Sequence, residues 1–152
     1  MTITLEDSIE IKATPEKVFD RLTHLFREKE DYQSWHPDHV DLYWIRGKPF
    51  EEGSIGYCEE YLHGEIHKFK FLCTKVVPNR MIEYRPMFPW SIFWPRSTFV
   101  VEPKGEKSCI FSATGYLRAG PLFKKLGRNR LEAVKKHMKE EGENLKRLVE
   151  NE

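Results

Sequence analysis

The chain has 152 residues, the length of one ordinary domain, and we expect a single domain spanning 1–152. Its 25 Lys and Arg residues against 24 Asp and Glu residues leave a net charge near +1, so no overall field favours nucleic acid or an anionic membrane. The N-terminal residues carry dispersed charges, and no apolar run approaches the length of a spanning helix. We therefore expect a cytoplasmic protein that binds neither nucleic acid nor membrane.

Strand and helix patterns follow one another in a definite order. Alternating polarity predicts a strand over Ile3–Ala13, and Thr14-Pro15-Glu16 then supplies an N-cap and a proline at the first helical position. Between Val40 and Arg118, short runs of β-branched and aromatic residues alternate with turn signals, which predicts five or six antiparallel strands. After Gly120-Pro121 the composition turns to Leu, Lys, Glu and Arg, which predicts a final helix of roughly 25 residues.

This order of elements resembles that of the START-like (SRPBCC) helix-grip superfamily over the whole chain. The resemblance implies an α+β fold in which a curved antiparallel sheet of about six to seven strands wraps round a long C-terminal helix. It also implies an interior cavity for a hydrophobic or aromatic small molecule, as in polyketide cyclases and other ligand-binding members of the superfamily.

The final helix carries polar groups on its apolar face. At about 100° per residue, four apolar residues form one stripe, and Glu141 falls near the centre of that stripe, with His137 one turn before it. The stripe consists of Val134, Met138, Leu145 and Leu148. A buried carboxylate without a partner is costly, so this position calls for a cation, a hydrogen-bond network or a metal. The alternatives are a helix rotated to expose Glu141, or a His137–Glu141 pair at the edge of the stripe.

Two strand patterns add further candidates. In the run Gly56–Leu62, alternation favours an inward Glu60 over Glu59, as the one charge on a small apolar face. In the next strand His67 shares a face with aromatic residues, and it is either a spare metal ligand or a hydrogen-bonded core histidine. The cysteines have no CxxC spacing, and we expect all three to be small buried residues. They are Cys58, Cys73 and Cys109.

Asp31–His39 is dense in reactive side chains, with two imidazoles, two acids, a tyrosine and a tryptophan around one proline. We expect this segment to be a functional loop. Together with Glu60-Tyr61-Leu62 and His137–Leu145, it resembles three motifs of the 2,4-diacetylphloroglucinol hydrolase family. Enzymes of that family use zinc and a START-like domain to cleave a carbon–carbon bond between an aromatic ring and an acyl group.

Carried over residue by residue, the resemblance implies a zinc site and two neighbouring catalytic side chains. The implied metal ligands are His39, Glu60, His137 and Glu141. Two imidazole nitrogens and two carboxylate oxygens suit Zn²⁺. Tyr32 would supply a hydroxyl that contacts the substrate, and His36 would orient a ligand or relay a proton.

The chain also departs from that family. It has about half the length of the characterised hydrolases, and one residue is missing between Pro37 and Asp38. Leu42 stands where the family has an asparagine that touches the substrate, so a hydrogen bond is lost. The metal site is therefore implied more strongly than the substrate.

Three hypotheses about function follow. The first is a zinc-dependent hydrolase acting on an acylated aromatic ketone, with Tyr32 or His36 moving a proton. The second is a protein that binds a hydrophobic ligand without turnover, or a metal-free polyketide cyclase or aromatase. The third uses the aromatic segment Phe88–Trp94, within a stretch interrupted by Pro86, Pro89 and Pro95, as a surface for a lipid, another protein or a second subunit of a homodimer. A lid over the cavity mouth is the plainer interpretation of that segment.

Overall fold

In the residues that this computed structural model describes, 2–118 and 128–152, seven strands form one antiparallel sheet. Their order across the sheet is β1-β7-β6-β5-β4-β3-β2. The strands are β1 (Thr2–Ile11), β2 (His39–Arg46), β3 (Ile55–Leu62), β4 (Glu65–Val77), β5 (Met81–Pro86), β6 (Arg96–Gly105) and β7 (Ser108–Arg118). The series β2 to β7 confirms the prediction of five or six antiparallel strands after the first helix.

The helices are α1 (Pro15–His24), α2 (Lys29–Trp35), the short 3₁₀ helix η1 (Trp90–Ile92) and α4 (Arg128–Glu150). Helix α1 begins as expected, because the Thr14 side chain accepts a hydrogen bond from the backbone N–H of Lys17. The first strand ends at Ile11, two residues earlier than expected. No helix in the described part of the chain is both long and apolar enough to cross a membrane.

One sequence-based expectation about helices was wrong, and another is tested only in part. The segment expected as a loop, Asp31–His39, is helical up to Trp35, because α2 occupies its first half. The final helix is described from Arg128 to Glu150 and contains 23 residues. The start expected just after Gly120-Pro121 lies outside the described residues.

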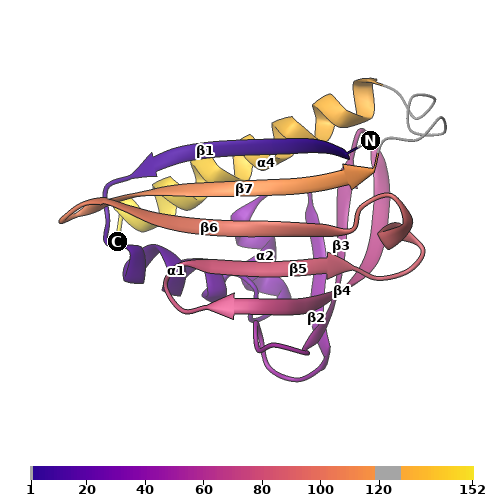
Figure 1. The fold of residues 1–152 in the computed structure, drawn as a ribbon, viewed down its shortest axis with the longest axis horizontal. Coiled ribbons are helices and arrows are strands. Elements are labelled where there is room, and N and C mark those ends of the chain that lie inside the picture. Colours follow the sequence, from indigo (N-terminus) through magenta and orange to yellow (C-terminus); the bar gives the residue numbers. More distant parts are fainter. Residues whose placement is uncertain (1, 119–127) are drawn as a thin grey trace.

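The sheet curves round the C-terminal helix. Figure 1 shows α4 lying along one face of the sheet, with strands β2 and β3 turned across the direction of β1, β7 and β6 and the long strand β4 bending from one direction into the other. Helices α1 and α2 lie on the same side of the sheet as α4, where α1 contacts β6 and α2 contacts β2. This is the helix-grip architecture expected from the order of elements.

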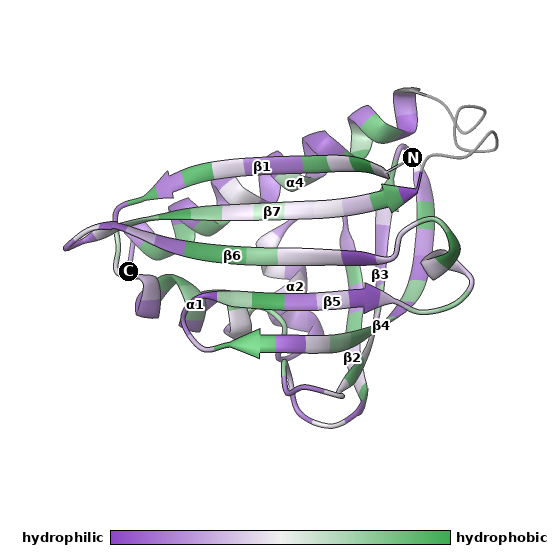
Figure 2. Cartoon of the chain, viewed as in Figure 1, coloured by the Kyte–Doolittle hydropathy of each residue, from purple (hydrophilic) through white to green (hydrophobic). Residues whose placement is uncertain are grey.

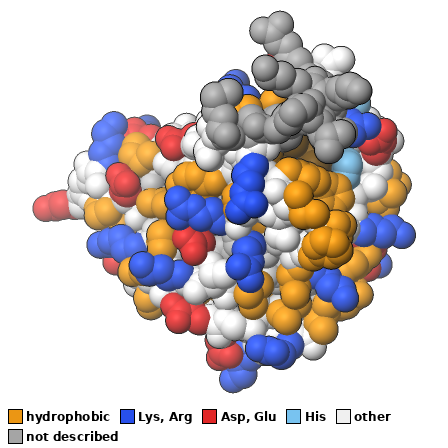
Figure 3. All heavy atoms as spheres, turned by 45° about the vertical axis from the view of Figure 1, so that its right-hand side comes forward, with side chains coloured by type: hydrophobic (Ala, Val, Ile, Leu, Met, Phe, Trp, Pro, Cys, Tyr) orange, Lys and Arg blue, Asp and Glu red, His pale blue; other side chains and the backbone are white. Residues whose placement is uncertain are grey.

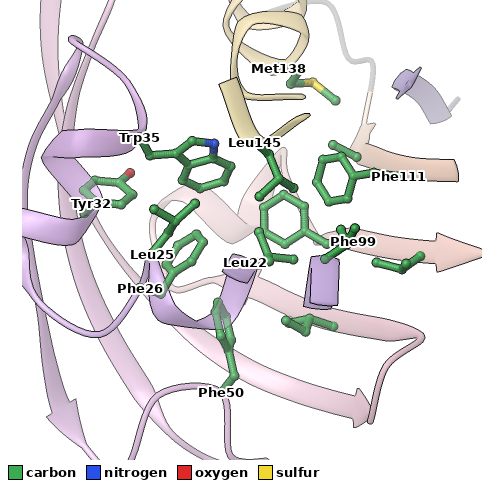
Figure 4. Packing of buried hydrophobic residues seen from close by; sticks show 14 of the residues in the cluster. Leu22, Leu25, Phe26, Tyr32, Trp35, Phe50, Phe99, Phe111, Met138 and Leu145 are labelled. Atoms are coloured by element: carbon green, nitrogen blue, oxygen red, sulfur yellow. The ribbon is translucent and has the colours of Figure 1, made fainter. Parts of the chain in front are cut away.

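The core lies between α4, the two short helices and the concave face of the sheet. Figure 4 shows Leu145 and Phe99 at its centre, with Phe26 and Trp35 packed beside them. The ring centroids of Phe26 and Trp35 are 5.3 Å apart in an edge-on arrangement. The side chain of Leu145 has no exposed surface, and burial of one such leucine contributes about 1.5–3 kcal/mol.

The expected apolar stripe of α4 faces this core. Met138 and Leu145 are buried, and Figure 2 shows hydrophobic residues interspersed with hydrophilic ones along the helix. The three cysteines are free and buried, as expected.

Candidate metal centre and cavity

Four side chains from three elements converge beneath helix α4. His39 is the first residue of β2, and its partner across the ladder is Glu60 on β3. His137 and Glu141 lie one turn apart on α4, on the face that packs over the sheet. One potential ligand atom from each of the four residues lies within 4.8 Å of all the others. The structure therefore brings together all four residues that the sequence suggested as metal ligands.

The donor atoms of this cluster are close enough to share one ion. His39 Nε2 lies 2.9 Å from Glu141 Oε2, 3.2 Å from His137 Nε2 and 3.7 Å from Glu60 Oε2. His137 Nε2 lies 3.2 Å from Glu141 Oε2 and 3.6 Å from Glu60 Oε2. A tetrahedral zinc ion with ligands at about 2.1 Å holds its donor atoms about 3.4 Å apart. The measured separations bracket that value.

The backbone fixes the tautomer of His39. Its Nδ1 lies 2.8 Å from the carbonyl oxygen of Tyr32, so Nδ1 carries the hydrogen and donates it. In the neutral ring Nε2 then presents a lone pair, and this lone pair points at the Glu141 carboxylate. Two electron-rich atoms at that distance need a positive charge between them, either a proton or a metal ion. The arrangement fits a cation site.

His137 and Glu141 each shift the pKa of the other. Burial would lower the pKa of His137, but the nearby Glu141 carboxylate, through its charge and a hydrogen bond, raises that pKa to about 10. Burial would likewise raise the pKa of Glu141, yet His137 and then His39 hold it below its ordinary value. The cluster thus retains a proton tightly. A buried site that holds a proton in this way is electrostatically suited to a divalent cation.

Tyr32 supports the cluster from helix α2. Its hydroxyl donates a hydrogen bond of 2.8 Å to Glu60 Oε2, and its ring stacks on His39 with centroids 3.8 Å apart. Burial, followed by the negative charge of Glu60, raises the pKa of Tyr32 well above its ordinary value. The hydroxyl therefore keeps its proton and orients one carboxylate oxygen of Glu60.

His36 lies behind His137 rather than at the converging donor atoms. The two ring centroids are 4.3 Å apart, while His36 Nδ1 accepts from the backbone N–H of Asp38 and Nε2 lies 3.2 Å from Glu140 Oε1. Burial, and next the charge of His137, lowers the pKa of His36, so its ring stays neutral. Both nitrogens of His36 are therefore engaged away from the cluster.

Helix α2 is tied to α4 at the level of the cluster. The indole N–H of Trp35 donates to the backbone carbonyl of Glu141 at 2.9 Å. The amide of Asn144 donates to the carbonyl of Trp35, also at 2.9 Å. These two bonds fix the position of α4 relative to α2, and they help to hold Glu141 close to His39.

A cavity of about 400 Å³ opens beside the cluster. Its walls are mostly aromatic and aliphatic, and Glu60, His137 and Glu141 border it. Along α4 the lining runs from Arg130 to Glu141, which at 1.5 Å per residue corresponds to about 16 Å. The cavity is large enough for a drug-sized ligand, and the cluster lies at one end of it.

Comparison with protein families identifies the group to which this architecture belongs. The family model described as polyketide cyclase / dehydrase and lipid transport matches residues 2–150. The chain belongs to this polyketide cyclase family. No curated protein matches the sequence.

Solved structures share the fold of this polyketide cyclase family member at low sequence identity. The Zhui aromatase/cyclase from Streptomyces sp. R1128 is 13% identical, with a TM-score of 0.81 over 99% of this chain and 95% of that one. Norcoclaurine synthase from Thalictrum flavum, in complex with dopamine and hydroxybenzaldehyde, is 15% identical, with a TM-score of 0.77 over 99% and 88%. A START superfamily protein from Mycobacterium smegmatis is 16% identical, with a TM-score of 0.71 over 97% of each chain.

The aromatic segment after β5 is divided between the cavity and the surface. Trp90, Phe93 and Trp94 line the cavity of this family member, as a lid would. Phe88 and Ile92 instead point outward, with 79% and 58% of their surface exposed. Figure 3 brings this side forward and shows hydrophobic side chains gathered on it, with Lys and Arg between them. The dimer surface suggested for this segment stays a prediction.

The structure adds cavity residues that sequence reasoning did not single out. Tyr84 on β5 and the buried Ser97 and Thr98 on β6 give the apolar wall its polar groups. Alternation with the buried Ile82 was the available signal for Tyr84. His67 also lines the cavity with its ring edge-on to Trp90, but it is not in the four-residue cluster.

Proposed function

We propose that this polyketide cyclase family member is a zinc-dependent hydrolase that cleaves a carbon–carbon bond between an aromatic ring and an acyl group. The observation that carries the proposal is the convergence of four donor atoms at one end of an apolar cavity. The motif resemblance to the 2,4-diacetylphloroglucinol hydrolase family supports the same activity. His39, Glu60, His137 and Glu141 would hold the ion.

Zinc at this position would supply a Lewis acid able to polarise a ketone oxygen. Hydrolysis of the bond adds the elements of water: the acyl carbon gains a hydroxyl group and becomes a carboxylic acid, and the ring carbon gains a hydrogen. The walls of the cavity, which include Phe93, Trp94 and Phe99, would hold the ring and exclude bulk water.

The side chains suggested as catalytic have different positions relative to this cavity. Tyr32 borders a smaller cavity of about 60 Å³, together with two of the proposed ligands, Glu60 and Glu141. His36 touches His137 and would act through that ring. The proton-transfer roles of Tyr32 and His36 stay predictions.

The test begins with metal content and not with activity. We expect elemental analysis to find about one zinc per chain, reduced to near zero in Glu141→Gln, because the amide keeps the shape of the carboxylate but loses its charge. Glu143→Gln is the matched control, since Glu143 lies on the same helix with its side chain exposed. An unaltered chain that takes up no zinc at all would eliminate the proposal.

Activity follows from the same preparations. We expect zinc-loaded protein and Glu143→Gln to convert acylphenols or other aromatic ketones to a carboxylic acid and the deacylated ring, and Glu141→Gln to be inactive. Product identification by mass spectrometry distinguishes this cleavage from ring closure. Equal turnover by Glu141→Gln would mean that the cluster is not the reaction centre.

The second candidate function is binding of an aromatic ligand without metal, either as a carrier or as a cyclase. The apolar cavity of about 400 Å³ favours it, as do the fold-level relatives, one of them an aromatase/cyclase and another a synthase structure that holds dopamine and hydroxybenzaldehyde. Ligand binding that is equal in zinc-free and zinc-loaded protein, without cleavage, is the outcome expected from this candidate.

A further inference from the structure

One buried nitrogen beside the cluster lacks a hydrogen-bond partner. Among the described residues, Nδ1 of His137 accepts and donates no hydrogen bond, although the side chain is only 7% exposed. Nε2 of the same ring faces Glu141, and when Nε2 binds a metal ion the hydrogen of the ring is on Nδ1. A buried donor left unpaired costs about 1–3 kcal/mol. The position calls for an acceptor.

A carboxylate that is not among the four proposed ligands, that of Asp38, lies close to the His137 ring. A ring nitrogen of His137, a ring nitrogen of His36 and a carboxylate oxygen of Asp38 all lie within 4.8 Å of one another. Asp38 Oδ2 is 3.9 Å from His36 Nδ1, but that nitrogen already accepts the backbone N–H of Asp38 and has no hydrogen to offer. The Asp38 carboxylate is therefore not engaged by His36, and its side chain is 49% exposed.

The backbone of Asp38 is fixed while its side chain is free to turn. Its N–H donates to His36 Nδ1 at 2.9 Å, and its carbonyl accepts from the N–H of Tyr61 at 2.8 Å. The next residue is His39 itself, at the start of β2. The side-chain torsions of Asp38 are thus the degrees of freedom that set the distance between its carboxylate and His137.

We infer that Asp38 is a positioning residue whose carboxylate accepts the Nδ1 hydrogen of His137 and holds that ring in place for the metal. The inference rests on the proposed zinc site. Histidines that bind metals commonly donate their second ring hydrogen to a carboxylate or carbonyl, which fixes the ring and raises its basicity. His39 has such a partner in the carbonyl of Tyr32, and Asp38 gives His137 the equivalent.

The same three side chains could be viewed as a second metal site, and the hydrogen bonds argue against it. His36 uses Nδ1 to accept from Asp38 and directs Nε2 at Glu140, so neither lone pair is available. His137 would have to bridge two ions through both nitrogens. A hydrogen bond from His137 to Asp38 requires neither change.

The test is zinc affinity, measured by competition with a chelator. Removal of such a supporting carboxylate typically lowers metal affinity about 10–100-fold, so we expect that loss in Asp38→Ala. Asp38→Asn keeps an acceptor oxygen and is expected to recover most of the affinity. Asp41→Ala is the matched control, because Asp41 lies on β2 and, among residues 2–118 and 128–152, its carboxylate accepts a hydrogen bond only from the neighbouring N–H of Leu42.

The outcomes separate this inference from the proposed function. If the unaltered protein binds no zinc, the zinc site itself fails. If the unaltered protein binds zinc and Asp38→Ala binds it equally well, Asp38 has no positioning role. Two zinc ions per chain, one of them lost in Asp38→Ala, would make Asp38 a ligand and overturn the inference. Thermal unfolding of the zinc-free variants is expected to match the unaltered protein, which shows that the fold is intact.

Discussion

The hydrogen bond between Tyr32 and Glu60 offers a direct probe of how the cluster is held. Tyr32→Phe removes only the hydroxyl, because the ring remains stacked on His39 at 3.8 Å. The lost bond is 2.8 Å long, partly buried and accepted by a carboxylate. Hydrogen bonds to charged groups contribute about 1.5–3 kcal/mol, so we expect that loss in the free energy of unfolding of the zinc-free protein.

For a domain of this length, such a loss lowers Tm by about 3–12 °C. Zinc affinity is expected to fall by about 10–100-fold as well, since Glu60 loses the group that orients it. Urea unfolding and chelator competition measure the two effects. Tyr61→Phe serves as control, because Tyr61 lies next to Glu60 with 45% of its surface exposed. Zinc affinity and unfolding free energy both equal to those of Tyr61→Phe would refute this account of the cluster.

Two further predictions concern the cavity wall. Gly115→Ala places a Cβ 2.9 Å from Trp94, so we expect a loss of about 1–3 kcal/mol in urea unfolding and weaker binding of aromatic ligands as Trp94 shifts. Gly105→Ala, where the nearest atom is 3.4 Å away, is expected to change little. Trp90→Ala is expected to weaken ligand binding and leave the native mass unchanged, because Trp90 lines the cavity. Dissociation of a dimer by this change would assign the segment to a subunit contact.

Much of the fold could be predicted from short-range patterns. The Thr14 cap, the period-2 runs of the strands and the composition of the last helix each depend on neighbouring residues only. Helix α2 escaped prediction because it is seven residues long and buries just Tyr32 and Trp35. Two buried positions in one short, charged segment do not make a helical stripe.

Part of the site was also predictable, because short-range patterns indicate three of its four residues. Helix geometry put Glu141 near the centre of the apolar stripe with His137 one turn before it, although a rotated helix stayed an alternative, and strand alternation favoured Glu60. His39 came only from the motif resemblance, since no local pattern indicates that the start of β2 lies under the middle of α4. The open donor on His137 and its neighbour Asp38 emerge only in three dimensions, because they depend on how α4 docks against the segment before β2.

The burial of His39 has a consequence for the order of events at the cluster. His39 has no exposed side-chain surface, while the other three members border the cavity, so under the proposed zinc site an ion that enters from this cavity would pass through the space that a ligand would fill. Binding of the ion by that route would come before binding of a large ligand. A ligand bound in the cavity would then block this path and slow the exchange of the ion with solution.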